Sequence, residues 1–76
     1  MDVSISHWYG CGYPEVAAAL AAEVAGALGV VVRLVPGGGE REFTVRVDGR
    51  VVFTRADRGR LPTPDEMLEL VAARRA

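Results

Sequence analysis

The chain has 76 residues, of which 50% are hydrophobic and 25% are charged, a composition that excludes disordered and collagen-like classes and predicts a single domain over 1–76. The formal net charge is −1, with arginine as the only basic residue type besides one histidine, and this balance argues against a nucleic-acid or membrane surface as partner. The apolar stretch 16–35 is interrupted by charges and glycines and is too polar for a membrane-spanning helix. The N-terminus lacks a secretory-signal pattern, and a single cysteine suits a reducing compartment. We therefore expect a cytoplasmic protein.

The first predicted elements are a strand and a helix. Apolar and polar residues alternate in Val3–Ser6, which predicts a half-buried strand that ends near His7 or Trp8. Pro14 is typical of a first helical turn, and the run 16–28 repeats apolar residues every fourth position until Gly29 ends the helix. The residues of this stripe are Val16, Leu20, Val24 and Leu28.

The next element is a β-branched run, Val30–Val35, which is apolar at nearly every position. Such a run predicts a strand that lies inside a sheet or is covered on both faces. The order strand, helix, strand implies a right-handed parallel crossover. The glycine run Gly37–Gly39 that follows is read as a connector, because a strand and not a helix N-terminus comes next.

A β-hairpin is predicted where Phe43–Val47 and Arg50–Thr54 flank Asp48-Gly49. Two alternating runs across an Asp-Gly pair are the strongest short-range hairpin signal. An uninterrupted ladder places Val51 and Phe53 on the face that also carries Thr44 and Arg46. The expected cross-strand pairs are Val47 with Arg50, Val45 with Val52, and Phe43 with Thr54.

The C-terminal part is predicted to be a charged loop, Ala56–Leu61, followed by a helix. Thr63-Pro64-Asp65-Glu66 has the capping-box pattern of a helix N-terminus. The apolar stripe of this helix comprises Met67, Leu70 and Val71 with Leu68 beside it, and its basic C-terminal end comprises Arg74 and Arg75.

These elements predict an α/β fold: a four-stranded mixed sheet with two helices packed on one face. The other face is then partly open, and we expect Val51 and Phe53 to form an apolar patch there. Such a patch suits a homodimer or another protein partner, although isolated exposed apolar residues are also ordinary.

Cys11 is the only cysteine, and it lies between two glycines in the turn before the first helix. Unsatisfied N–H groups and the positive end of the helix dipole favour the thiolate at such a position. His7, four residues earlier, is a candidate to assist deprotonation, or is simply a residue at a strand end. One Cys and one His are too few for a structural zinc site, and no motif indicates a cofactor.

The chain resembles the Rdx family of thioredoxin-like proteins, the selenoprotein W-like group that also includes selenoproteins T and H. The resemblance rests on Cys11-Gly12-Tyr13 at the helix start, on 43–53, and on Gly59-Arg60-Leu61-Pro62. It implies the βαβ-ββ-α architecture and a role in cell redox homeostasis. In that family the loop carries Cys-x-x-Cys or Cys-x-x-selenocysteine; the second position matches Cys11, and the first falls on Trp8.

Two functions stay open at this point. The first is a thiol-redox protein that acts through Cys11 alone, as a monothiol oxidoreductase, with glutathione or a protein thiol as the second sulfur or with a sulfenic acid as intermediate. The second is a non-catalytic interaction module on the same scaffold. For either, the candidate binding surface comprises Trp8, Tyr9, Gly10, Gly12, Tyr13 and Phe53, whose aromatic members suit recognition or packing over the core.

Overall fold

The computed structural model describes residues 1–74. Its elements in chain order are β1 (Val3–His7), α1 (Tyr13–Leu28), β2 (Val32–Pro36), β3 (Phe43–Val47), β4 (Arg50–Thr54), α2 (Arg55–Arg58) and α3 (Pro64–Ala73). The four strands form one sheet in the order β2-β1-β3-β4, with β1 and β2 parallel and the other neighbours antiparallel. The predicted mixed sheet and parallel crossover are confirmed.

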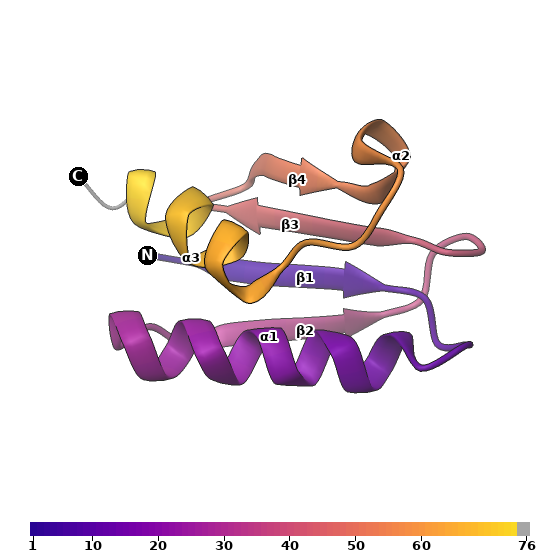
Figure 1. Ribbon diagram of the computed structural model, residues 1–76, viewed down its shortest axis with the longest axis horizontal. Helices are drawn as coiled ribbons and strands as arrows, with labels where there is room; N and C mark the ends of the chain where they lie inside the picture. Colours follow the sequence, from indigo (N-terminus) through magenta and orange to yellow (C-terminus); the bar gives the residue numbers. More distant parts are fainter. Residues whose placement is uncertain (75–76) are drawn as a thin grey trace.

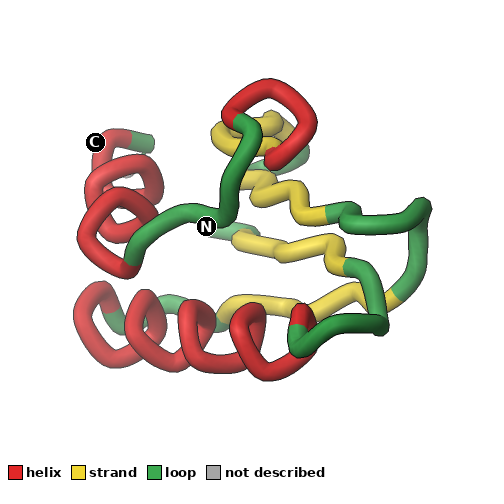
Figure 2. The backbone as a smooth tube through the Cα atoms, turned by 45° about the vertical axis from the view of Figure 1, so that its right-hand side comes forward, coloured by secondary structure: helices red, strands yellow, loops and turns green. Residues whose placement is uncertain are grey.

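The two longer helices cover the same face of this sheet (Figure 1), and α1 and α3 lie side by side in contact. Figure 2 shows both helices in one layer beside the strands. The largest fully buried side chains come from the helix-facing side of the strands and from α1 and α3, and include Phe43, Phe53, Ile5 and Met67. This core fixes the end of β1, from which the loop to α1 departs.

The hairpin forms at the predicted turn, but its ladder contains a β-bulge. Asp48 and Gly49 both have positive φ, 52° and 79°, as a two-residue turn of type I′ requires, and Val47 pairs with Arg50 as predicted. Beyond Arg46, which pairs with Val51, the register shifts by one residue of β4. The pairs predicted for Val45 and Phe43 are therefore wrong: the observed pairs are Val45 with Phe53 and Thr44 with Thr54.

The bulge turns Phe53 into the core. Its side chain is 2% exposed and packs edge-on against Phe43, with ring centroids 6.5 Å apart, while the Arg58 guanidinium lies 5.7 Å from the Phe53 ring centroid. The prediction of Phe53 as part of an exposed partner surface is wrong, because one extra residue reverses the face on which the following side chains lie. Val51 is 47% exposed, as expected.

The helix-free face of the sheet is mainly polar along β1 and β3. An Arg46 Nη1 group donates to Ser6 Oγ at 3.0 Å, and Thr44 Oγ1 donates to a Glu42 carboxylate oxygen at 2.6 Å. The apolar patch that was expected from Val51 and Phe53 thus does not form on this face.

Strand β2 lies at an edge of the sheet, which contradicts the prediction of an internal or covered strand. Leu34 and Val35 are 39% and 41% exposed, and Val31, just before the strand, is 80% exposed. A run that is apolar at nearly every position is typical of a strand covered on both faces, but here it belongs to an edge that the rest of the described chain leaves open.

The charged segment after β4 begins with one helical turn, α2, where only a loop was predicted. Thr54 Oγ1 caps this turn by accepting a hydrogen bond from the Ala56 N–H at 3.3 Å. The capping box of α3 is confirmed, with Met67 and Val71 buried as predicted and Arg74 at the C-cap. Arg75 lies outside the described residues.

Candidate functional site

The candidate site is the loop from Trp8 to Gly12, which leads from β1 into the N-terminus of α1. Cys11 and Gly12 both have left-handed backbone conformations, with φ values of 49° and 75°. The Tyr13 N–H donates to the Gly10 carbonyl oxygen at 3.0 Å, which closes the turn. Left-handed backbone at a non-glycine residue costs on the order of 1–3 kcal/mol and is concentrated at functional sites. Here the non-glycine residue in this conformation is Cys11, and it is exposed.

The N-terminus of α1 has no side-chain cap. Its N-cap residue is Gly12, and the helix begins at Tyr13, one residue before the predicted start. A glycine at this position supplies the left-handed conformation but no oxygen that could accept from the first turn. The Tyr13 N–H is bonded to the Gly10 carbonyl oxygen and Pro14 has no N–H, so the Glu15 N–H is the one donor of the first three helical residues to which no acceptor is assigned within residues 1–74.

Trp8 acts as a support for this loop. The main-chain N–H of Trp8 donates to the Glu42 carbonyl oxygen at 2.8 Å, and this bond ties the loop to the segment before β3. The indole ring lies against Gly10, where an added Cβ would be 2.8 Å from Trp8 Cζ2, and it meets the Tyr13 ring edge-on at 5.6 Å. Sequence reasoning missed Glu42, because an acceptor on the main chain leaves no signal in residue identity.

The predicted binding residues divide into an exposed group and a supporting group. Tyr9 is 73% exposed, with its ring 6.2 Å from that of Trp8, and Cys11 and Gly12 are also exposed. Tyr13, in contrast, is buried and continues the aromatic contacts to Phe43, at 6.4 Å between ring centroids. Trp8 and Gly10 are of intermediate exposure, so the residues of this surface that are most open to a reactant are Tyr9, Cys11 and Gly12.

His7 is 4% exposed at the end of β1, on the helix-covered side of the sheet with its cross-strand neighbour Phe43. Its Nδ1 donates to the Trp8 carbonyl oxygen at 2.9 Å, since a carbonyl can only accept. This bond fixes the ring against the start of the loop. A role for His7 in deprotonating Cys11 stays a prediction.

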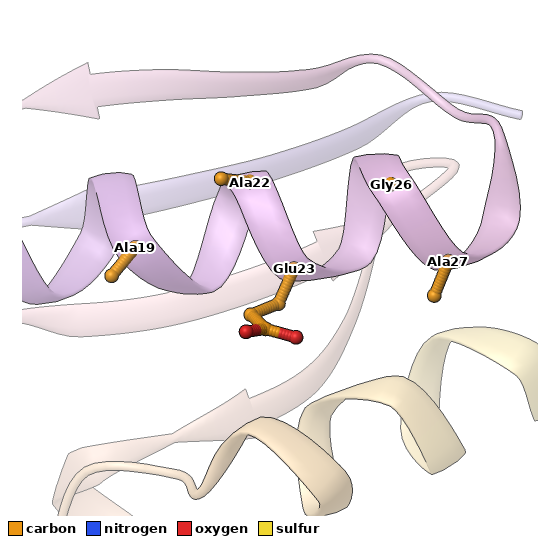
Figure 3. A pocket seen from close by; sticks show the side chains of 5 residues that line it. All are labelled: Ala19, Ala22, Glu23, Gly26 and Ala27. Atoms are coloured by element: carbon orange, nitrogen blue, oxygen red, sulfur yellow. The ribbon is translucent and has the colours of Figure 1, made fainter.

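Two hollows of the described surface are not lined by Cys11. One is lined by Val47, Asp48, Arg50 and Arg74, and the other lies on the outer face of α1 (Figure 3). Within residues 1–74 no group of three His, Cys, Asp or Glu side chains is placed to hold a metal ion, and no helix is long and apolar enough to cross a bilayer. The chemistry that the site offers is that of a thiol at an exposed helix N-terminus.

Comparison with known proteins gives one family and a set of similar structures. The model of the Rdx family matches residues 2–73. A selenoprotein W-related protein from Vibrio cholerae has a TM-score of 0.80 at 20% identity, covering 96% of both chains. A protein from Bordetella parapertussis has a TM-score of 0.81 at 25% identity, covering 97% of this chain and 99% of the other. A search of curated proteins gave no match.

Proposed function

Because the chain belongs to the Rdx family, whose fold is that of a thioredoxin-like redox protein, we propose that it is a thiol-redox protein acting through Cys11 alone. The observation that carries this proposal is the exposed cysteine in a left-handed turn at a helix N-terminus without a side-chain cap. The position three residues earlier, which holds the first sulfur in the family, is Trp8 and supplies packing instead.

The proposed cycle consists of two thiol–disulfide exchanges. The Cys11 thiolate attacks one sulfur of glutathione disulfide or of a protein disulfide, so that a Cys11–sulfur bond forms, the old disulfide bond breaks and a thiolate leaves. A second external thiolate then attacks the mixed disulfide at the other sulfur and releases the Cys11 thiolate. Alternatively, a hydroperoxide oxidises Cys11 to a sulfenic acid, which condenses with an external thiol and releases water.

A reducing compartment such as the cytoplasm supplies the external thiol that this cycle requires. The same thiol pool would keep a lone exposed cysteine from remaining oxidised. Glutathione and protein thiols are therefore the partners that we propose for the site.

The test compares the rate at which iodoacetamide modifies Cys11 in the folded protein and in an unstructured peptide of residues 8–14, between pH 5 and 9. The proposal predicts that the folded protein reacts several-fold faster than the peptide below pH 8, because the peptide lacks the folded turn at the N-terminus of α1. We also expect a glutathione adduct by mass spectrometry, and none with Cys11→Ser. Equal rates in protein and peptide, without an adduct, would contradict the proposal.

A second candidate, a non-catalytic interaction module, is favoured by the exposure of Tyr9 beside the thiol, at 73%. Exposed tyrosines are common anchors in protein interfaces. The two functions differ in how a partner responds to substitution: a redox partner is lost with Cys11→Ser, whereas a partner of the interaction module is lost with Tyr9→Ala and retained with Cys11→Ser.

A further inference from the structure

His7 places a polar side chain where the alternation of β1 calls for an apolar one. On the helix-covered side of this strand lie Val3, Ile5 and His7, and all three are buried. A buried polar group needs a hydrogen-bond partner, whereas an apolar residue fills such a position without one. The partner of the His7 ring within residues 1–74 is the Trp8 carbonyl oxygen, 2.9 Å from Nδ1. What the imidazole adds to packing is therefore a bond to the first residue of the loop.

With this bond, both main-chain groups of Trp8 are held by the sheet. Its N–H donates to the Glu42 carbonyl oxygen at 2.8 Å, next to β3, and its C=O accepts from the ring of His7. Two fixed peptide planes determine the direction in which the chain leaves the sheet. His7 is itself fixed by the sheet, because its carbonyl oxygen accepts from the Gly37 N–H at 3.0 Å. The donor therefore belongs to the rigid sheet and the acceptor to the loop.

The Trp8 ring transmits this attachment to the turn around Cys11. It lies against Gly10, where an added Cβ would be 2.8 Å from Cζ2, and the Gly10 carbonyl oxygen accepts from the Tyr13 N–H at 3.0 Å. Cys11 lies between these two bonded residues with a φ of 49°, a conformation that a non-glycine residue keeps only where its surroundings impose it. Loosening Trp8 would therefore allow Cys11 to adopt a negative φ, which moves its thiol.

We propose that His7 is a positioning residue for Cys11, because its Nδ1–H bond to the Trp8 carbonyl oxygen holds the loop in the conformation that presents the thiol. This role rests on the proposed redox function of Cys11 and differs from proton transfer. The imidazole donates from Nδ1 in its neutral form, with the proton on that nitrogen, and in its protonated form, so the role persists when the ring gains a proton. A base, in contrast, works only in the neutral form.

The first experiment separates the hydrogen bond from the packing of the ring. His7→Asn keeps an N–H donor at the δ position but removes buried volume, and His7→Leu keeps most of the volume but has no donor. For each variant we measure the rate at which iodoacetamide modifies Cys11 at pH 7 and the free energy of unfolding in urea. His7→Leu should slow modification about three- to tenfold, the effect that corresponds to one lost hydrogen bond. His7→Asn should keep the rate within about twofold of wild type, although the lost volume lowers its stability.

The matched control is Val3→Ala, at the opposite end of β1. It removes buried volume far from the loop, so it should lower the free energy of unfolding and leave the rate at Cys11 unchanged. Trp8 is the only tryptophan, and its fluorescence therefore reports on the loop directly. Acrylamide should quench this fluorescence more strongly in His7→Leu than in wild type, His7→Asn or Val3→Ala. A rate that falls in Val3→Ala or in His7→Asn as much as in His7→Leu overturns the proposal.

The second experiment follows the same rates between about pH 5 and 8, the range in which histidine titrates. The ratio of the wild-type rate to the His7→Leu rate should stay constant, because the Nδ1–H bond is present throughout. A ratio that rises as the imidazole loses its proton would make His7 a base and overturn the positioning role. If wild type reacts faster than the peptide of residues 8–14 and His7→Leu is equally fast, the positioning role fails and the redox function stands. If wild type reacts no faster than the peptide, both fail.

Discussion

The two longer helices begin in opposite ways. At the N-terminus of α3, Thr63 Oγ1 accepts from the Glu66 N–H at 3.1 Å, and a Glu66 carboxylate oxygen accepts from the Thr63 N–H at 3.4 Å. Arg60 donates to both oxygens of that carboxylate, at 2.7 and 2.9 Å. At the N-terminus of α1, Gly12 occupies the cap position and no side chain accepts from the first turn.

Under the proposed function, the terminus that stabilises the fold and the terminus that carries the reactive thiol are different ones. The α3 terminus is closed by polar side chains that satisfy its N–H groups. The α1 terminus has no side-chain cap, and the loop that carries Cys11 is held by main-chain hydrogen bonds and by the Trp8 ring. Substitutions at the two termini should therefore have different consequences.

The largest effect on stability is expected from Gly12→Ala. A Cβ in the left-handed conformation costs about 1–2 kcal/mol, so the free energy of unfolding should fall by about that amount. Gly26→Ala is the matched control within the same helix, where an added Cβ meets open space and should stabilise by about 0.5–1 kcal/mol. Urea denaturation measures both; equal changes of one sign would show that the turn does not impose its conformation.

The next effect concerns the cap of α3. Thr63→Ala removes the acceptor for the Glu66 N–H and should lower the free energy of unfolding by about 1 kcal/mol. Thr63→Ser retains the hydroxyl and serves as control. A loss of glutathione reactivity at Cys11 in the alanine variant would contradict the separation of the two termini, because the cap is expected to affect stability only.

The smallest effect is a dependence on pH. The Arg60 hydrogen bonds, followed by the Thr63 N–H, lower the pKa of Glu66 from 4.5 to about 2. A folded-state pKa below the unfolded value means that the ionised carboxylate stabilises the fold above about pH 4.5, and that this contribution is lost as the pH falls toward 2.

The corresponding measurement is the urea midpoint of wild type and Glu66→Gln from pH 6 to pH 2. Glutamine keeps the reciprocal capping bond without the charge, so the two curves should converge at the acidic end. The difference should also shrink in high salt, because the ion pair is exposed. If the difference in urea midpoint between wild type and Glu66→Gln stays constant across this pH range, the Glu66 charge adds nothing to the stability of the cap.

Local sequence signals predicted much of this fold. Asp48-Gly49 gave the hairpin turn, and Thr63 with Glu66 gave the start of α3, because each signal depends on conformations available to residues close in sequence. The position of Cys11 before a helix was also predicted in this way, together with the parallel crossover. The order of these elements predicted the four-stranded mixed sheet with two helices on one face, and the family resemblance implied the same architecture.

The features that sequence reasoning missed depend on tertiary context. The bulge at Val52 adds a residue that the alternation of apolar and polar positions does not reveal. Because of this extra residue, the prediction that Phe53 is exposed is wrong. The apolar run of β2 reads the same at an edge as in the middle of a sheet. The support of the loop by Trp8 requires Gly10 and Glu42 at distances that only the folded chain defines.

The Trp8 ring against Gly10 has a kinetic consequence under the proposed chemistry. A loop with two sulfurs resolves a mixed disulfide by a first-order reaction, at a rate fixed by its own geometry. A loop in which indole fills that space must wait for an encounter, so the lifetime of its adduct varies inversely with the concentration of free thiol around it. The time for which such a protein stays modified would therefore report the concentration of free thiol around it.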